Sequence, residues 1–443
     1  MRLEWVGQSR EDGEAGQLDP SRLVNCYRVA NGDALYLRAV PGMTQMADLS
    51  DVFLRALEEI NGTLYAVHGG KLASVASDGT ITTLSASVTD SAQTTIAGNN
   101  GAVAVASGGS YAVWNGVTLS SPATGAFSSV GSVEFFEQRT FISELNGRRV
   151  SWSDVADATT FDALNFATAE SRDDDIVRIM ALGGVLWVFK QTSIEIWGGD
   201  GAGGYAILPG RVIDRGIKDF SLLTRIPGGA FFIGNDGVAY LAAGDNIQPV
   251  STQAVMTAID EKTPTHCLYY EDRGQKFAAI RFSDRAAWVY DLSTQEWHER
   301  AQGETLQPWQ AITAARAYGK QIVGTTQAVL CELDRTQTDF GDPMVRKAVS
   351  RTLAMGGRRF RVARVDLLPV TGRAAGASLL YRVSRDRGET WGPQKGRTLG
   401  ETGQYGQVVA LRALGSGHSF NLEVVISAAA DVPLSAIAEV QVA

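Results

Sequence analysis

Hydrophobic and polar residues alternate in short runs along most of this chain, and pairs of turn-forming residues separate the runs. The pattern is clearest in residues 54–84, where Asn61-Gly62, Gly69-Gly70 and residues 77–79 (Ser-Asp-Gly) divide four runs, each suited to a strand of about five residues. Glycine and asparagine tolerate the positive φ angles that tight hairpin turns require. The segment is therefore predicted to form one four-stranded antiparallel sheet.

Units of the same kind recur along the chain, whereas helical periodicity is nearly absent; residues 252–262 are the best candidate for a short helix. Self-similar four-stranded sheets at a regular spacing are typical of radial repetition. We therefore predict an all-β fold with a β-propeller, for which six and seven blades fit the pattern nearly equally well. The further units lie at residues 94–121, 132–154, 176–198, 221–251, 267–301 and 312–334.

The segments outside these units have different patterns. Two strands are expected at residues 23–27 and 34–40, and such an N-terminal strand could close the ring by completing the last blade. Residues 1–20 are polar and acidic without periodicity, which predicts an extended or poorly ordered arm. Residues 152–171 interrupt the strand pattern and are interpreted as a surface excursion between blades.

The charge of the chain changes sign along its length. The whole sequence carries a net charge of −8, but residues 1–342 hold 26 Lys and Arg against 41 Asp and Glu, and residues 343–443 hold 14 against 7. Double-glycine turns become rare at the same point, so we expect a propeller domain at 21–342 and a basic domain at 343–443. Opposite charge in two parts of a chain predicts different neighbours for each part, or attraction between them in an assembly.

The basic domain contains longer alternating strands, and its pattern predicts an antiparallel β-sandwich. Phe360 and Val362 would face the core, so Arg359 and Arg361 are predicted to line an exposed surface. The expected strands are residues 360–368, 378–384, 407–411 and 420–426.

Cysteine use and hydropathy restrict the class of protein further. Cys26, Cys267 and Cys331 are odd in number and far apart, which does not suit a disulfide framework and fits folding in a reducing cytoplasm. We expect all three to be buried as small hydrophobic residues. No apolar run approaches the roughly 20 residues that span a bilayer, and the opening residues lack the apolar core of a secretory signal, so neither feature is expected.

One motif in the basic domain has a clear structural meaning. Residues 384–391 (Ser-Arg-Asp-Arg-Gly-Glu-Thr-Trp) match the Asp-box pattern Ser-x-Asp-x-Gly-x-Thr-Trp. Ser384 and Asp386 are expected to bond turn amides, Gly388 to take the left-handed conformation and Trp391 to pack beneath the hairpin. The motif therefore predicts a stapled β-hairpin and argues little for glycan cleavage.

The remaining motifs do not predict chemistry. Residues 199–204 satisfy G-x-G-x-x-G, but no helix follows to bind a pyrophosphate, so we expect a loop. Asp173, Asp174 and Asp175 are interpreted as a solvated acidic turn rather than a calcium site, because consecutive side chains on an extended chain point to alternate sides. The sequence thus predicts no enzyme and no catalytic, metal-binding or cofactor-binding residue. The histidines, which lack ligand spacing, are His68, His266, His298 and His418.

Several segments, taken in their order along the chain, carry a resemblance to a known family. The chain resembles the packaged-DNA stabilisation proteins, which are the tail hub or nozzle subunits of short-tailed bacteriophages. The segments are residues 23–27, 37–44 (LRAVPGMT), 62–72 (GTLYAVHGGKL), 170–197, 215–217, 231–241, 287–297 and the basic C-terminal sandwich.

The resemblance implies a structural protein of the virion tail, assembled in the host cytoplasm. Family members look like β-propellers with an added β-domain, arranged as a ring below the portal and its adaptor. The implied partners are further copies of the chain in a homohexameric ring, the head-tail adaptor, tail fibre, spike or needle proteins, and the packaged double-stranded DNA that passes through the channel. No membrane insertion and no cofactor are implied.

Two other classes of protein stay open at this stage. A glycan-binding or glycan-cleaving propeller would gather carboxylates, tyrosines or arginines at the centre of the ring, and Glu195, Asp236 and Asp272 are the first candidates. A propeller scaffold of some cellular complex is the third possibility. Portal and capsid genes near the gene for this chain would favour the phage class.

Overall fold

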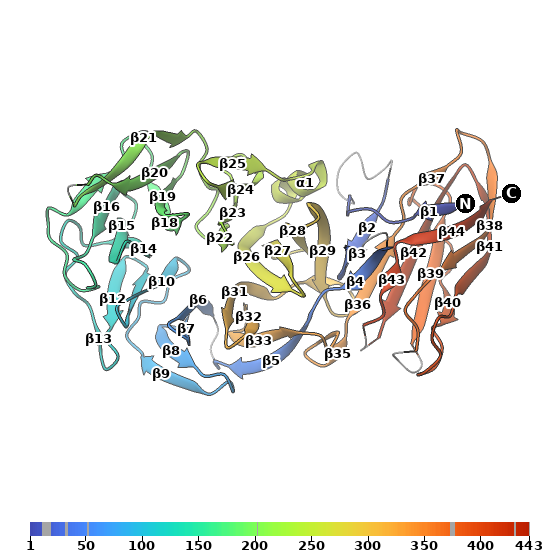
Figure 1. Cartoon of the computed structure of the whole chain (residues 1–443), viewed down its shortest axis with the longest axis horizontal. Helices are drawn as coiled ribbons and strands as arrows, with labels where there is room; N and C mark the ends of the chain where they lie inside the picture. The colour runs from blue at the N-terminus through green and yellow to red at the C-terminus, as the bar shows by residue number, and fades with distance from the viewer. Residues whose placement is uncertain are drawn as a thin grey trace.

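The computed structural model describes residues 1–10, 19–31, 34–50, 53–201, 203–372, 377–428 and 431–442. In the described residues, strands in seven four-stranded antiparallel arrangements form a β-propeller, which confirms the predicted fold class. Figure 1 shows these blades around a common centre, with a second β-domain at one side.

Each of the first five blades is built from four consecutive strands. The first blade is β6 (Leu54–Ile60), β7 (Thr63–His68), β8 (Lys71–Val75) and β9 (Ile81–Ser85). The second is β10 (Thr94–Asn99), β11 (Ala102–Ser107), β12 (Ser110–Trp114) and β13 (Leu119–Ser120), and the third is β14 (Val130–Phe136), β15 (Arg139–Glu144), β16 (Arg149–Trp152) and β17 (Phe166–Thr168). The fourth is β18 (Ile176–Leu182), β19 (Val185–Lys190), β20 (Ile194–Gly199) and β21 (Tyr205–Ile213), and the fifth is β22 (Leu223–Ile226), β23 (Gly229–Ile233), β24 (Ala239–Ala243) and β25 (Asn246–Pro249).

The last two blades complete the ring. The sixth is β26 (Pro264–Asp272), β27 (Gln275–Phe282), β28 (Ala287–Asp291) and β29 (Glu296–Gln302), to which the short β30 (Gln307–Pro308) is added. The seventh is β31 (Ala311–Ala317), β32 (Lys320–Thr325), β33 (Val329–Asp334) and β5 (Gly42–Asp48). The first strand of each blade lies innermost, and β31 contacts both β26 and β6, so the ring returns to its first blade.

The strand that closes the ring is β5, which pairs antiparallel with β33 from Gly42↔Asp334 to Asp48↔Val329. An N-terminal strand therefore completes the last blade, but the expected candidates at residues 23–27 and 34–40 were wrong for this role. The alternation of β5 is irregular, with two buried residues followed by two exposed ones, and its pairing with β33 shifts register between Leu330 and Cys331. Gly42 is required where the parallel strand β34 (Thr338–Asp339) approaches, since a Cβ there would lie under 3.0 Å from the Thr338 backbone.

The other N-terminal strands join the second domain. Strand β1 (Arg2–Glu4) pairs with β44 (Ile437–Val442), so the segment expected as an arm contains a strand of the sandwich. Its alternation was too short to be recognised. Strands β3 (Cys26–Asn31) and β4 (Ala34–Ala39) form a sheet with β43 (Leu434–Ser435).

Strand β2 (Arg22–Val24) connects the two domains. It pairs with β36 (Val345–Val349) of the second domain and forms a parallel bridge with β29 of the sixth blade. The path β26-β27-β28-β29-β2-β36-β42-β39-β40 is consequently one continuous sheet. The division of the chain at residues 342/343 remains our proposal, with residues 22–24 as a shared strand.

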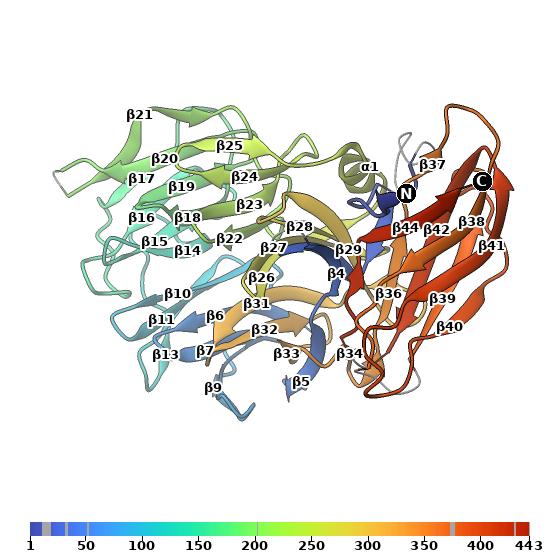
Figure 2. The same ribbon diagram turned by 45° about the vertical axis from the view of Figure 1, so that its right-hand side comes forward.

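Two sheets of the second domain face each other across one hydrophobic core. One contains β1, β44, β38 (Phe360–Leu367) and β41 (Val409–Gly417). The other continues from β36 through β42 (Ser419–Ser427), β39 (Ser378–Ser384) and β40 (Lys395–Thr398), with β37 (Leu353–Ala354) at the side of β42. Figure 2 shows β38 and β41 at the end of the molecule away from the propeller, as does Figure 1.

The remaining elements are short. Helix α1 (Gln253–Glu261) lies where a helix was expected, is capped by Thr252, and buries Val255 and Ile259 against the fifth and sixth blades. Strand β35 (Asp342–Pro343) pairs with β34. The expected excursion at residues 152–171 includes β17, the outer strand of the third blade, which the lapse of alternation concealed.

Ring closure yields the first prediction. The substitution Gly42→Ala should destabilise the protein by about 1–3 kcal/mol, because the added Cβ displaces the Thr338 backbone that packs against β5. Urea unfolding of the full chain measures the change. Gly396→Ala on the exposed strand β40 is the control, since the nearest atom to its Cβ, in Leu380, is 3.6 Å away. Equal stability of the two variants would contradict the role of Gly42.

The junction between the domains yields a second prediction. Glu299 on β29 is fully buried and accepts two 2.8 Å hydrogen bonds from the Arg22 guanidinium on β2. Glu299→Gln should reduce the free energy of unfolding by roughly 3–5 kcal/mol, because it removes the charge of a fully buried carboxylate that accepts from both Arg22 and Arg285.

The same unfolding measurement on Glu332→Gln is the control for this junction. Glu332 and Lys320 form a 2.8 Å ion pair in which both side chains are about one third exposed, so its loss should change stability by at most about 1 kcal/mol. If Glu299→Gln costs no more stability than Glu332→Gln, the Arg22–Glu299 pair does not stabilise the junction between the domains.

Candidate functional site

The innermost strands of all seven blades surround a channel with a volume of about 880 Å³. Side chains alternate along a strand, so one residue of an inner strand faces the core between blades and the next faces the channel. On β6, Leu57 is buried in the core between blades, whereas Glu58 is exposed to the channel. Side chains from all seven blades meet in this channel.

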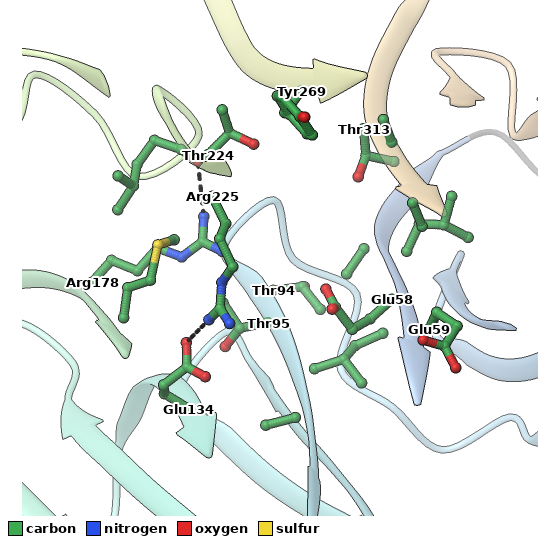
Figure 3. A pocket seen from close by; sticks show the side chains of 18 of the residues that line it. Glu58, Glu59, Thr94, Thr95, Glu134, Arg178, Thr224, Arg225, Tyr269 and Thr313 are labelled. Carbon is green, nitrogen blue, oxygen red and sulfur yellow. Dashed lines mark hydrogen bonds and ion pairs between the residues drawn. The ribbon is translucent and has the colours of Figure 1, made fainter. Parts of the chain in front are cut away.

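Charged residues from three blades gather on one side of this channel (Figure 3). Arg225 on β22 and Glu134 on β14 form a 2.7 Å ion pair. Arg178 on β18 donates from Nη1 to the Leu223 carbonyl oxygen at 3.3 Å and stacks over the Phe220 ring at 5.2 Å. Figure 3 shows the two guanidinium groups beside each other, and Glu58 pointing into the same space from β6.

The enclosure changes the acidity of these groups. Burial raises the pKa of Glu58 to about 7; the nearby Arg225 opposes this rise and Glu134 adds to it. Burial lowers the pKa of Arg178, whereas Glu134 raises the pKa of Arg225. Glu58 is thus a carboxyl group of raised pKa that opens into the channel, and Arg225 and Arg178 are the cations that act on it.

The residues proposed from the sequence for the ring centre lie elsewhere. Glu195 is buried in the fourth blade and accepts a 2.8 Å hydrogen bond from Trp197. Asp236 accepts from Tyr240 at 2.7 Å in the β23–β24 turn, and Asp272 accepts from Tyr27 at 3.0 Å at the end of β26. None of the three lines the described channel, so the residue-level prediction for a glycan site was wrong.

Sequence reasoning missed the actual cluster, although one signal for it exists. The charged residues of the cluster each lie on the first strand of a repeated unit; they are Glu58, Glu134, Arg178 and Arg225. Polar residues that interrupt the first strand of successive units are those that a propeller directs to its axis. Recognising them requires the blade boundaries, which the sequence predicts only approximately.

The acidic turn contains a buried ion network, which corrects the interpretation of Asp174 as solvated. Asp174 and Lys190 form a 2.9 Å ion pair, and the fully buried Lys190 also contacts Glu195 at 3.4 Å. The Lys190 ammonium donates to the carbonyl oxygens of Ala169 and Arg172 as well. The alternation of adjacent side chains was correctly expected, because Asp173 points outward and only Asp174 turns into the blade.

The Asp-box forms the expected hairpin staple between β39 and β40. Ser384 accepts a 2.8 Å hydrogen bond from the Gly388 amide, and Asp386 accepts a 2.9 Å bond from the Thr390 amide. Gly388 has a φ of 93°, and Trp391 stacks with the Arg382 guanidinium at 5.1 Å. Hydrogen bonds from Ser384 and Thr390 lower the pKa of Asp386 to about 2.

The other motifs are also structural. Residues 199–201 and 203–204 belong to the end of β20 and the loop to β21, with no helix after them; residue 202 lies outside the described residues. Cys26, Cys267 and Cys331 are free and buried as expected. Burial raises the pKa of Cys26 and of Cys331 to about 12, which keeps both thiols protonated at neutral pH.

The described part of the chain contains neither a metal-ligand cluster nor a membrane-spanning helix. No three His, Cys, Asp or Glu side chains come together there in a way that could hold a metal ion. In the same residues no helix is long and apolar enough to cross a membrane.

The outer face of the sheet with β38 is basic. Phe360 and Val362 are buried and Arg359 and Arg361 are exposed, as the alternation predicted. The neighbouring strand β41 adds the exposed Arg412. This surface lies at the end of the molecule away from the propeller (Figure 2).

These features define a seven-bladed β-propeller fused through a shared sheet to a basic β-sandwich. The chain belongs to the phage stabilisation family described as "Bacteriophage P22 Gp10, beta-propeller", whose profile matches residues 8–338. The resemblance inferred from the sequence is thereby confirmed. No curated protein matches the chain.

Solved structures align with the chain at low sequence identity. The extracellular domain of a hybrid two-component system from B. thetaiotaomicron aligns with a TM-score of 0.46 and 11% identity, over 66% of this chain and 39% of that chain. The Neurospora crassa Pan2 WD40 domain aligns with a TM-score of 0.45 and 9% identity, over 66% and 95% of the two chains. This chain thus spans well under two thirds of the first of these structures.

The buried ion network yields a prediction of stability and of its pH dependence. Lys190→Met should reduce the free energy of unfolding by roughly 3–5 kcal/mol at pH 7, because it leaves two buried carboxylates without their cation. Burial opposes ionisation of Asp174, but hydrogen bonds from Lys190 and Thr192 hold its pKa below the ordinary value. The ionised form therefore contributes stability above pH about 4, and this contribution is lost as the pH falls further.

Urea unfolding at pH 7 and at pH 3.5 measures both parts of this prediction, and the difference between wild type and Lys190→Met should shrink at the lower pH. Arg148→Met is the control, because Arg148 pairs with the exposed Asp173 at 2.6 Å and should contribute at most about 1 kcal/mol. If Lys190→Met and Arg148→Met lose the same free energy of unfolding at pH 7, the buried network does not stabilise the fold.

Proposed function

We propose that this chain is a structural subunit in the tail hub or nozzle of a short-tailed bacteriophage. In this proposal copies of the chain form a ring, a homohexamer, below the portal and adaptor, and the ring retains the packaged DNA and seats fibre, spike or needle proteins. The protein acts by assembly rather than by catalysis. It joins the virion tail during assembly in the host cytoplasm.

The shared sheet between the two domains is the observation that carries the proposal. A closed ring needs two different faces on each subunit, held at a fixed angle, so that successive contacts return to the first copy. Strand β2 pairs with β29 and with β36, and the buried Arg22–Glu299 pair fastens the same place. A propeller and a sandwich joined in this way supply two rigid faces.

An apolar strip on the propeller rim supports a contact between copies. Leu164 is 84% exposed beside β17, and Phe166 on that strand is 37% exposed. Strand β17 contacts β21, where Ile207 and Val212 are also exposed. Exposed apolar groups on adjacent outer strands are typical of surfaces that a partner covers.

The size of the propeller channel favours a DNA path between subunits. A duplex is at least roughly 16 Å wide, as its two groove depths indicate. A cylinder of that width with a volume of 880 Å³ is only about 4 Å long. This length is close to the roughly 3.4 Å rise of one base pair, so the channel of one propeller is too small to hold a duplex. In the proposed ring, DNA therefore passes along the propellers, and the acidic balance of residues 1–342 limits adhesion of its phosphates.

The basic face around Arg359 and Arg361 is proposed to dock on an acidic surface of the adaptor. Both arginines are exposed, and Arg412 on the neighbouring strand extends the positive surface. The face lies away from the propeller (Figure 1), which leaves the propeller sides available for contacts within the ring. Contact between this face and DNA is the alternative use of the same charge.

Reconstitution tests the function. Purified chain mixed with the adaptor complex of the same phage should form rings that electron microscopy resolves, and Arg359→Glu with Arg361→Glu should reduce their yield at least tenfold through charge reversal. Lys395→Glu with Arg397→Glu is the matched control, because it makes the same charge change on exposed positions of β40, in the other sheet. Absence of rings with the wild-type chain would refute the hub role. A ring yield that is unchanged by Arg359→Glu with Arg361→Glu would refute the docking face.

A further inference from the structure

Two cations lie side by side on one wall of the propeller channel. Figure 3 shows the guanidinium groups of Arg178 and Arg225 beside each other, and Arg225 forms a 2.7 Å ion pair with Glu134. Glu58 acts on both cations from β6. Arg178 bonds a backbone carbonyl, and its buried Nε has no hydrogen-bond partner among the described residues. An anion beside Arg178 would give this N–H group a partner.

Uncharged polar groups complete the walls. Thr224 and Thr313 line the channel from β22 and β31, and Tyr269 lies between them on β26 (Figure 3). The Tyr269 hydroxyl already donates to Glu271 at 2.6 Å, so the threonines and Glu58 are the groups available to a bound molecule. These side chains can accept hydrogen bonds from the uncharged polar groups of a ligand and donate to them, away from the ligand's anionic group.

We propose that the central channel binds a small acidic sugar, whose carboxylate contacts Arg178 and Arg225 and whose hydroxyl groups contact Glu58, Thr224 and Thr313. Guanidinium groups match the planar geometry of a carboxylate and often bind it through two parallel hydrogen bonds. The channel volume of about 880 Å³ falls within the roughly 300–1,000 Å³ of small-molecule sites. A doubly charged inorganic phosphate suits the site less, because Glu58 and Glu134 face the same space.

Binding is coupled to the protonation of Glu58. The ionised Glu58 repels a carboxylate, whereas the protonated form donates a hydrogen bond to it. With a pKa of about 7, Glu58 is roughly 90% protonated at pH 6 and 10% at pH 8. If only the protonated form binds, affinity falls about tenfold between these values.

Charged groups face Glu58 from several strands of the channel. Glu59 is its neighbour on β6, Glu134, Arg178 and Arg225 face it from β14, β18 and β22, and Arg316 lies on β31. Strand β10 carries no titratable residue. His266 on β26 is neutral at both pH values, because burial lowers its pKa to about 4.

Calorimetric titration of the full chain with glucuronate, and with glucose as the neutral analogue, tests the proposal. Glucuronate should bind about tenfold more tightly at pH 6 than at pH 8, and glucose at least tenfold more weakly than glucuronate at pH 6. Arg225→Gln and Arg178→Gln should each weaken glucuronate binding at least tenfold. Glu58→Gln, which mimics the protonated carboxyl group, should keep the binding and remove its pH dependence.

Controls separate this site from general charge effects and from unfolding. Arg148→Gln removes an equal charge from the exposed 2.6 Å pair with Asp173, outside the channel, and should leave glucuronate affinity unchanged. Thermal unfolding confirms that each variant is folded. No glucuronate binding by the wild-type chain, equal binding of glucose or of inorganic phosphate, or full binding by a folded Arg225→Gln chain would each overturn the proposal. Ring assembly with the adaptor is a separate readout, so failure here leaves the hub role standing.

Discussion

The pairing of β5 with β33 is the constraint on which the rest of the structure depends. It joins residues 42–48 to residues 329–334, near opposite ends of the propeller segment, and converts a row of blades into a closed ring. The buried Arg300 strengthens this closure by donating to the Pro41 carbonyl oxygen at 2.8 Å and stacking on Trp309 at 4.3 Å. Contacts so distant in sequence are slow to form, because the chain loses much entropy before they bring stability. Closure is therefore costly in chain entropy, and the packing around it must offset that cost.

Closure also determines what surrounds the ring. Once β5 is fixed at residue 42, the preceding strands β2 to β4 must leave the propeller at its seventh blade, where they meet the C-terminal domain. The same N-terminal segment therefore closes the ring and ties the sandwich to it. A subunit with two faces at a fixed angle follows from this single path of the chain, with no need for a large interface between separately folded domains.

The sequence predicted those parts of the fold that depend on local rules. Hairpin turns such as Asn61-Gly62, the Asp-box staple and the outward arginines around Phe360 follow from backbone conformation and alternation over a few residues. The identity of the closing strand and the number of blades depend on pairings between distant segments, which no local pattern specifies. Asp174 was misjudged for the same reason, because its burial depends on Lys190 sixteen positions away.

The ring also explains why the candidate site escaped sequence reasoning. Glu58, Glu134, Arg178 and Arg225 are separated by dozens of residues and belong to four different blades. A motif search looks for functional groups at fixed spacing, but a propeller collects one residue from each repeat at its axis, with spacings that vary with the loops. The charges of this chain then divide by surroundings: pairs such as Lys190–Asp174 and Arg22–Glu299 are buried and fix the fold. Arg225 in the channel and Arg361 on β38 stay exposed instead, so these charges are the ones on which the proposed contacts with other molecules depend.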